Sequence, residues 1–414
     1  MDYVGECETP KEFFRWAGLS LVAATLRDKV KVKCTAREEV PLNLFVVLLG
    51  PSGCGKEFAM TTALRLASGV NAVNAYQGKL TGQALTDMLC GEKSSPGVRK
   101  NALLKEGEIP AENHAIWLVM EELYRCMGKG DLAETLLGEL TALSNVRGEL
   151  QHHDMTRTHG LREVDRACIN WLGGSTKEWF IKSISSVEQI GGGLFARLFV
   201  PNYKRDRSEE AKSHPYPVIP ENHEEIEARL RWRLQQYAAL DSERDGLITL
   251  TEEADELYKD WYLRTQAPKD MDESHIVYPL FDKRTKPFFK FMGLESIMRH
   301  DFGTGAEPIP YPYLIEAEDV RKAEEWFNEM IACATRAYGV MIETPMAALC
   351  EKIRTFIQKA GPEGVKRSLI NARYGRRDRG HNIEDVNKAL DILKRSKDVA
   401  SQLNDDLWVW RGEA

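Results

Sequence analysis

Residues 44–56 read LFVVLLGPSGCGK, an apolar run that passes without a break into a loop rich in glycine. The run at residues 44–49 is too short for a helix of its own and consists mainly of residues that favour strands. Residues 58–66 then have the composition of a helix. A strand, the pattern G-x-x-x-x-G-K and a helix, in this order, form the context of a phosphate-binding loop. The sequence therefore predicts a nucleoside-triphosphate site at this junction.

Each kind of residue in the predicted loop has a role in holding a polyphosphate. The glycines let consecutive backbone N–H groups turn toward the phosphates, and the dipole of the following helix adds positive potential. Lys56 adds a full positive charge. The residues expected to contact the nucleotide are Gly50, Pro51, Ser52, Gly53, Cys54, Gly55, Lys56 and Glu57.

Glu57 departs from the usual pattern of such a loop, which has a Ser or Thr hydroxyl here to bind Mg²⁺. A carboxylate can also bind Mg²⁺, because hard oxygen ligands suit that ion. It would, however, bring negative charge to a loop that works by positive potential. We expect this repulsion to dominate, so that Glu57 points away from the triphosphate and hydrolysis is slow.

A second apolar run, AIWLVM at residues 115–120, ends in two adjacent acids. An apolar strand that ends in acids is typical of a Walker B motif, in which one carboxylate holds Mg²⁺ and the next polarises the attacking water. We assign the metal role to Glu121 and the base role to Glu122. The alternative is a pair of solvated acids at a strand end.

A third predicted strand, residues 167–172, ends in Gly-Gly-Ser-Thr. Ser175 and Thr176 would then lie at a strand tip, where they could sense the γ-phosphate or the attacking water. Arg197 precedes a further apolar strand. Its two interpretations are a surface ion pair and an arginine finger that acts on a neighbouring subunit.

The polar stretch at residues 151–166 predicts a hairpin of two short strands with Gly160 in the turn. Its histidines lack a carboxylate or cysteine at ligand spacing, which disfavours zinc. The hairpin would either face nucleic acid or be merely solvated. Its candidate DNA-binding residues are His152, His153, Arg157, His159 and Arg162.

The length of 414 residues indicates two to four domains, and the net charge of -7 argues against a uniformly basic DNA-binding protein. Eight scattered cysteines without a C-x-x-C pair are typical of a reducing cytosol. No run resembles a signal peptide or a membrane span. We expect a soluble protein of the cytoplasm. The predicted parts are an N-terminal helical segment at 1–38, a nucleotide-binding core at 39–214, a helical lid at 221–340 and a C-terminal domain at 345–414.

Three predicted helices at 347–360, 365–371 and 383–397, followed by a hairpin at 399–410, have the plan of a winged helix. Residues 351–414 contain 14 Lys and Arg against 10 Asp and Glu, a net charge of +4 in an acidic chain. Such a domain binds either DNA or protein. If it binds DNA, phosphate contacts would position its third helix in a groove. The candidate residues are Arg373, Arg376, Arg377 and Arg379.

The loop at 50–56, the LVMEE end at 118–122, the NWLGGST end at 170–176 and GLFAR at 193–197 together resemble the AAA+ ATPases. Less specific features, such as the segment TPKEFF at 9–14, are similar to segments of the replicative helicases and primase-helicases of phages and mobile elements. The resemblance covers about residues 5–340. It implies an α/β P-loop core with a helical subdomain.

The resemblance also implies ATP and Mg²⁺ as ligands, a hexameric ring in a bacterial cell, and a single DNA strand in the ring pore touched by the hairpin. Arg197 would reach into the neighbouring subunit's site. We therefore expect an ATP-dependent DNA helicase or translocase. Two alternatives stay open: a DNA-binding initiator or regulator that uses ATP only to assemble, and a protein-remodelling ATPase whose winged helix binds partners.

Overall fold

The computed structural model divides the chain into two compact units, residues 1–337 and residues 338–414. Within them it describes residues 3–4, 7–35, 38–70, 73–89, 115–122, 131–143, 152–156, 160–164, 167–183, 194, 197–203, 219–240, 246–268, 271, 277–300, 313–338, 345–361, 364–375, 383–395, 399–402 and 406–410.

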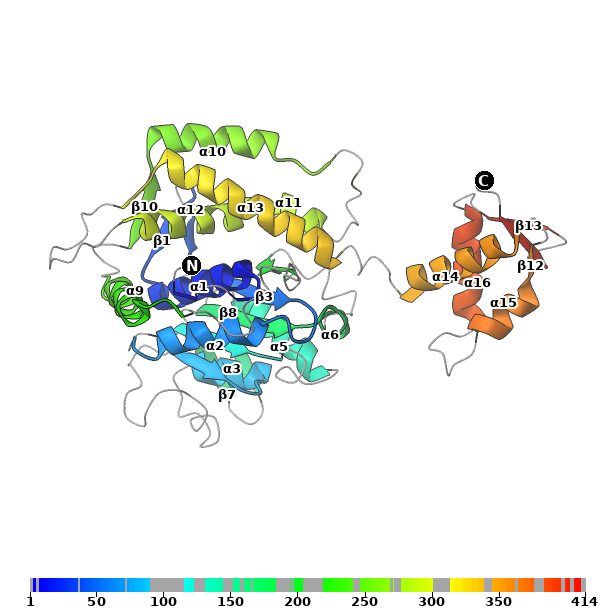
Figure 1. Cartoon of the computed structure of the whole chain (residues 1–414), viewed down its shortest axis with the longest axis horizontal. Coiled ribbons are helices and arrows are strands. Elements are labelled where there is room, and N and C mark those ends of the chain that lie inside the picture. The colour runs from blue at the N-terminus through cyan, green and yellow to red at the C-terminus, as the bar shows by residue number, and fades with distance from the viewer. Residues whose placement is uncertain are drawn as a thin grey trace. The chain divides into compact units, whose positions relative to one another are not determined.

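A five-stranded parallel sheet forms the centre of the first unit (Figure 1). Its strands, in spatial order, are β4 (Ala75–Gln77), β5 (Ala115–Met120), β8 (Cys168–Ser175), β3 (Phe45–Leu49) and β9 (Leu198–Phe199). Every residue of β3, β5 and β8 is buried. This burial explains the unbroken apolar sequences of β3 and β5, because a parallel sheet is covered on both faces. The α/β class with a mostly parallel sheet is thus confirmed.

Helix α1 (Lys11–Leu26) packs against β3, β5 and β8 and is held to the sheet by polar side chains. Trp117 Nε1 donates to Ser20 Oγ over 3.0 Å, and Asn170 Nδ2 donates to the carbonyl of Ala23 over 3.4 Å. Helix α2 (Lys56–Ala67) leaves the end of β3 and packs against α1 and β8. Both helices were expected from the sequence, and their existence is confirmed.

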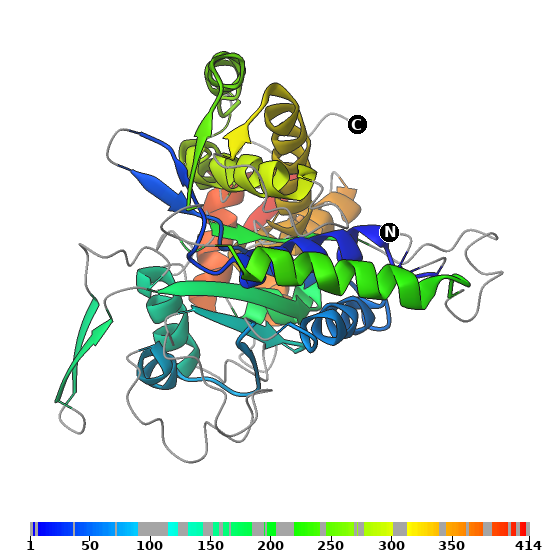
Figure 2. The ribbon, with the colours of Figure 1, turned by 90° about the vertical axis from the view of Figure 1, so that its left-hand side faces the viewer.

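Three further helices accompany the sheet. Helices α3 (Gly82–Leu89) and α5 (Asp131–Leu143) pack against each other, and α6 (Lys177–Ser183) directly follows β8. Helix α5 also packs against β8, so α3 and α5 lie side by side at the central sheet (Figure 2).

A second sheet joins segments that are far apart in the sequence. Its order is β11 (Leu314–Ile315), β10 (Leu247–Leu250), β1 (Lys31–Lys33) and β2 (Glu39–Pro41). Strand β1 pairs with β10 in parallel and with β2 in antiparallel fashion. The segment predicted as N-terminal and the segment predicted as a helical lid therefore share one sheet.

The segment predicted as a helical lid, residues 221–340, contains helices among the described residues. They are α9 (His223–Ala238), α10 (Glu252–Arg264), α11 (Tyr278–Asp282), α12 (Thr285–Arg299) and α13 (Ala317–Tyr338). Their core is aromatic: Trp261 of α10 stacks on Phe288 of α12 with 3.5 Å between ring centroids. Trp16 of α1 meets Trp326 of α13 edge to face at 5.0 Å, so these helices also pack on the central layer.

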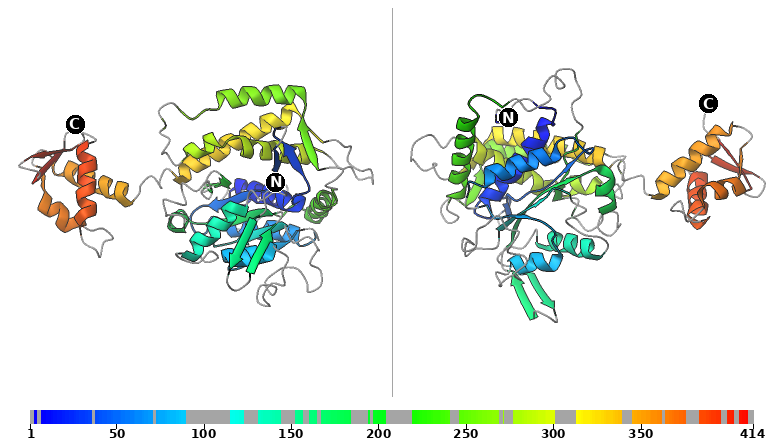
Figure 3. Two further views of the ribbon diagram at one scale, coloured as in Figure 1. Left: turned by 180° about the vertical axis from the view of Figure 1, so that it is seen from behind. Right: turned by 60° about the horizontal axis from the view of Figure 1, so that its bottom comes forward.

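The predicted hairpin forms, but its turn lies elsewhere than expected. Strand β6 (His152–Thr156) pairs with β7 (Gly160–Val164) in antiparallel fashion, and Thr156 is the partner of Gly160 (Figure 3). Gly160 is therefore the first residue of the second strand, and residues 157–159 connect the strands. The placement of Gly160 in the turn was wrong by one residue, since glycine is also allowed in an extended strand.

The second unit contains three helices and a three-stranded antiparallel sheet. The helices are α14 (Pro345–Lys359), α15 (Arg367–Tyr374) and α16 (Ile383–Arg395). The sheet has the order β12 (Val365–Lys366), β14 (Leu407–Trp410) and β13 (Val399–Gln402). The three helices and the terminal hairpin were expected, whereas β12 was not.

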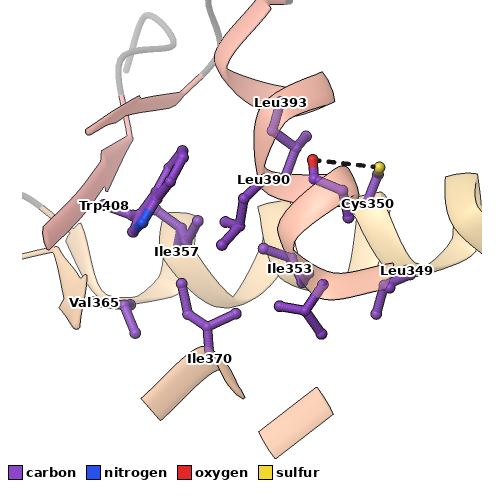
Figure 4. Close-up of a cluster of buried hydrophobic side chains, with 11 residues drawn as sticks. Leu349, Cys350, Ile353, Ile357, Val365, Ile370, Leu390, Leu393 and Trp408 are labelled. Carbon is purple, nitrogen blue, oxygen red and sulfur yellow. Dashed lines mark hydrogen bonds between the residues drawn. The ribbon is translucent and has the colours of Figure 1, made fainter. Parts of the chain in front are cut away.

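The core of the second unit is a cluster of buried side chains from all three helices and the sheet (Figure 4). Trp408 of β14 lies among Ile357, Leu390 and their neighbours. Cys350 Sγ donates to the carbonyl of Ala389 over 3.6 Å, linking α14 to α16. Among the helices described in either unit, none is both long enough and apolar enough to cross a membrane.

Candidate functional site

The loop between β3 and α2 has the backbone that its glycines predict. Gly53 and Gly55 have φ angles of 76° and 87°, in the left-handed region that favours glycine. The backbone N–H of Gly50 donates to the carbonyl of Ser175 over 3.3 Å, which ties the loop's start to β8. A side chain at Gly55 would collide with Thr9, whose Oγ1 lies 2.0 Å from the Cβ position. The loop is therefore fixed from both sides.

Lys56 is the first residue of α2, and its ammonium lies against the loop itself. Nζ donates to the carbonyls of Gly50 and Pro51 over 2.7 and 2.8 Å, and it lies 3.6 Å from Cys54 Sγ. These contacts hold a positive charge at the mouth of the loop, where it can also reach an anion.

The topology brings the ends of several strands to this loop. The chain continues from β3 to β4 at one edge of the sheet, but from the neighbouring β8 to β9 at the other edge. Ligands of parallel sheets bind outside the carboxyl ends of the strands at such a reversal of direction. The loop at 50–55 and the end of β8 both lie at this point.

Two acids follow β5 on the opposite side of the loop. Glu121 and Glu122 are both exposed. Loss of part of the water around its carboxyl, followed by the nearby charges of Glu57 and Glu122, raises the pKa of Glu121 above its usual range. Three carboxylates therefore share one small region, and their mutual repulsion favours a cation among them.

Glu57 lines the cavity together with the two acids. The expectation that its side chain points away from a triphosphate stays a prediction. Glu57 belongs to the first turn of α2, next to Lys56, and the helix N-terminus favours a carboxylate there. This local attraction acts against the repulsion that we expect from a triphosphate.

The end of β8 contacts the end of β5 closely because it contains glycine. A side chain at Gly174 would lie 2.8 Å from the carbonyl oxygen of Glu121. Ser175 Oγ donates to the carbonyl of Thr176 over 3.0 Å, and Thr176 Oγ1 accepts from the backbone N–H of Trp179 over 3.4 Å. Both hydroxyls face the same cavity as the loop, as the sequence predicted for a strand tip.

These elements enclose a cavity of about 840 Å³, large enough for a ligand of nucleotide size. It is lined by Ser52, Gly53, Cys54, Gly55, Lys56, Glu57, Phe58, Thr61, Glu121, Glu122, Gly174, Ser175, Thr176 and Trp179. Of the predicted loop residues, Gly50 and Pro51 do not line the cavity. The structure thus brings the loop, both acids and both hydroxyls together.

Phe58 and Trp179 are lining residues that the sequence reasoning missed. Their exposed fractions of 39% and 43% are unusual for large apolar side chains. Each follows a motif directly, in the first turn of α2 and of α6. That position, at the rim of a predicted site, is the signal that could have identified them.

Among the residues that the structure describes, no group of three His, Cys, Asp or Glu side chains could hold a metal ion by itself. Mg²⁺ that arrives with a nucleoside triphosphate needs only one or two protein carboxylates, since phosphates and water supply its other ligands. Glu121, which lines the cavity and to which we assign the metal role, fits this requirement.

Arg197 does not line the cavity. It lies directly before β9, at the sheet edge beyond β3, and its backbone N–H donates to the carbonyl of Leu194 over 2.8 Å. Its side chain is half-buried, and burial lowers the pKa of the guanidinium. From this position, Arg197 does not contribute to the cavity of its own chain.

The candidate DNA-binding residues are only partly described. In the hairpin, His153 is the register partner of Glu163, and Asp154 is the partner of Arg162, while His152 begins β6. Arg157 and His159 lie outside the described residues. Arg373 lies in the last turn of α15, with its guanidinium 4.6 Å from the ring centre of Phe356. Arg376, Arg377 and Arg379 also lie outside the described part of the chain.

No protein-family model matches the sequence, and a search of curated proteins found no similar sequence.

Proposed function

We propose that the first unit binds and hydrolyses a nucleoside triphosphate, with ATP and its Mg²⁺ as the substrate. One observation carries this proposal: a loop with two left-handed glycines and Lys56 faces two acids across a single cavity. Backbone N–H groups and a lysine suit a polyphosphate, and acids opposite them suit its metal ion and the attacking water. The proposed type of core is an AAA+ P-loop ATPase.

In this proposal, the residues around the cavity have separate roles in hydrolysis. The loop and Lys56 would hold the β- and γ-phosphates, and Glu121 would face the Mg²⁺ that comes with them. Glu122 would take a proton from water as the water oxygen bonds to the γ-phosphorus and the bond to the leaving ADP oxygen breaks. Ser175 and Thr176, at the tip of β8, would orient that water.

We further propose that hydrolysis drives movement along DNA, in a ring of identical subunits. The support is the resemblance of the motif order to AAA+ helicases and the net charge of +4 over residues 351–414. In such a ring Arg197 would act on a neighbouring subunit, which suits its position away from its own cavity. The second unit, as a winged helix, would hold duplex DNA.

Glu57 favours a second candidate function, an initiator or regulator that uses ATP mainly to assemble on DNA. Its carboxylate lines the cavity and adds to the negative charge around Glu121. Negative charge beside a triphosphate weakens binding and slows hydrolysis. A protein of this class would bind ATP but turn it over slowly.

The test is the rate of ATP hydrolysis by the full chain with and without single-stranded DNA. Stimulation by DNA supports the translocase, and slow hydrolysis that DNA leaves unchanged supports the regulator. Glu122→Gln should lower the rate at least about 100-fold, the scale of general-base loss. The matched control is Glu325→Gln, which changes an exposed glutamate of α13 in the same way. Equal rates in both variants would contradict the role of Glu122.

A further inference from the structure

A small pocket on the second unit is lined by basic and aromatic side chains. It lies between α14 and the end of α15 and has a volume of about 250 Å³. Its lining residues are Lys352, Thr355, Phe356, Lys359, Arg373 and Tyr374. Three of the six carry a positive charge and none is acidic, so the pocket suits an anion.

The aromatic side chains hold the arginine in a fixed place. Phe356 and Tyr374 meet edge to face with 5.9 Å between ring centroids. The guanidinium of Arg373 lies over both rings, 4.6 Å from the centre of Phe356 and 5.8 Å from that of Tyr374. Tyr374 donates its hydroxyl hydrogen to the carbonyl of Lys352 over 3.2 Å. The two rings also pack against the core of the unit, so this platform is rigid.

Cations and flat faces together match the chemistry of a nucleotide. Unpaired bases stack on aromatic rings and on guanidinium planes, and lysines contact the phosphates beside them. A base inside a duplex has both faces covered by its neighbours and cannot use such a platform. We propose that this pocket binds one unpaired nucleotide of a nucleic-acid strand, its base on the Phe356, Arg373 and Tyr374 platform and its phosphates at Lys352 and Lys359.

A phosphopeptide could offer similar groups, but the surrounding charge favours a nucleic acid. Arg376, Arg377 and Arg379 follow Tyr374 within five positions, and residues 351–414 carry a net charge of +4. A strand with a charge on every nucleotide uses such an extended basic segment, whereas one phosphorylated side chain needs a single cluster. The inference goes beyond the proposed hydrolysis, and it rests on the proposed function only in that nucleic acid is the partner.

The test measures binding of the full chain, without nucleotide, to a fluorescein-labelled oligothymidine and to a labelled hairpin duplex. The slope of log affinity against log salt is negative. For the single strand, Lys352→Ala combined with Lys359→Ala should make it less negative by about 1.4. Phe356→Leu should weaken single-strand binding roughly tenfold, since stacking of one base has this scale, and leave duplex binding unchanged. The control is Lys366→Ala, an exposed lysine outside the pocket.

A photocrosslink supplies the second readout and needs no variant. A strand containing 4-thiothymidine should crosslink to the wild-type peptides that hold Phe356 or Tyr374, as mapped by mass spectrometry. A strand that crosslinks only to other peptides, or a lysine variant that binds the single strand like Lys366→Ala, would overturn the proposal. Displacement of the strand by a phosphotyrosine peptide and not by thymidine monophosphate would overturn it in favour of a peptide site. Because the binding assay contains no ATP, its failure is separate from a failure of the proposed hydrolysis.

Discussion

The Nζ atom of Lys177 donates a hydrogen bond to the backbone carbonyl of Arg336 over 3.0 Å. Lys177 begins α6 directly after Thr176 at the cavity, and Arg336 lies in the last turn of α13. The guanidinium of Arg336 in turn contacts Cys333 Sγ at 3.0 Å and reaches the carbonyl of Asn202 at 3.5 Å. The wall of the cavity is therefore tied to the end of the first unit.

Loss of this bond should loosen the end of α13. We predict that Lys177→Met speeds amide hydrogen exchange at residues 333–337 about fivefold, because one hydrogen bond contributes about 1 kcal/mol. The control is Lys322→Met, which removes an ion pair of 2.9 Å with Glu318 from the first turns of the same helix. Equal exchange in wild type and Lys177→Met would show that the bond does not hold the helix end.

Lys56 is the residue on which the proposed hydrolysis depends most. Lys56→Ala should lower the rate of ATP hydrolysis roughly 100- to 1,000-fold, the scale for loss of one donor to a transition-state charge. ATP binding should weaken, and the fold should persist. Hydrolysis and thermal unfolding are measured together, with Lys33→Ala on the exposed side of β1 as control. Unchanged hydrolysis in a folded Lys56→Ala protein would remove the loop from the mechanism.

We expect Glu57 to influence the rate of ATP hydrolysis at acid pH. Its charge helps to raise the pKa of Glu121, so Glu121 loses its charge at a higher pH than an ordinary glutamate. Removal of the Glu57 carboxylate should lower the pKa of Glu121 and extend activity to lower pH. Glu57→Thr should also tighten Mg-ATP binding and speed hydrolysis, since the charge beside the triphosphate falls.

The measurement for Glu57 is ATPase rate against Mg²⁺ concentration and against pH, in wild type and Glu57→Thr. Glu57→Gln serves as the matched control, because it removes the charge but keeps the side-chain length. A loss of rate and of Mg²⁺ affinity in Glu57→Thr would mean that the carboxylate binds the ion directly.

The proposed ring of subunits can be tested by a substitution at Arg197. Arg197→Ala should still bind ATP and assemble, but its hydrolysis should fall roughly 1,000-fold or more, the scale of a missing arginine finger. When Arg197→Ala is mixed with Lys56→Ala, some interfaces pair an intact loop with an intact arginine, and part of the activity should return. Two inactive parents that exchange subunits without regaining activity would exclude a site shared between subunits.

The basic segment after α15 tests duplex binding. Replacement of Arg376, Arg377 and Arg379 by Ala should flatten the dependence of duplex affinity on salt, by about 0.9 in the log–log slope for each lost phosphate contact. The control replaces the same three residues by Lys, which keeps the charge and should keep the slope. An unaltered slope in the Ala variant would favour protein contact for the second unit.

Much of the central layer could be predicted because burial and sequence agree there. Strands β3, β5 and β8 are buried, β3 and β5 are unbroken apolar runs, and each of the three strands ends in a motif. The strands β2, β10 and β11 were missed, because each has only two to four residues and is only partly buried. The pairing of β10 with β1, in which Leu247 is the partner of Lys31, joins segments far apart in the sequence, and no local pattern reports it.

At the candidate site, too, some features could be predicted from the sequence and others could not. The loop, the acids and the hydroxyls lie together because parallel strands present their carboxyl ends at one edge of the sheet. The aromatic rim of Phe58 and Trp179 could not be predicted, since nothing in helix periodicity distinguishes a side chain at a cavity from one in the core. Two opposing charge effects act on Glu57, the attraction of the helix N-terminus and the repulsion of a triphosphate, and sequence alone does not rank them.

Thr9 packs against Gly55, although it lies before the first helix. The short lead-in to α1 is therefore a part of the loop's outer wall. A shortened version of the protein that starts at Lys11 would keep every residue of the cavity lining and still remove the support behind it. The smallest fragment that keeps this loop supported must therefore begin at or before Thr9, two residues ahead of α1.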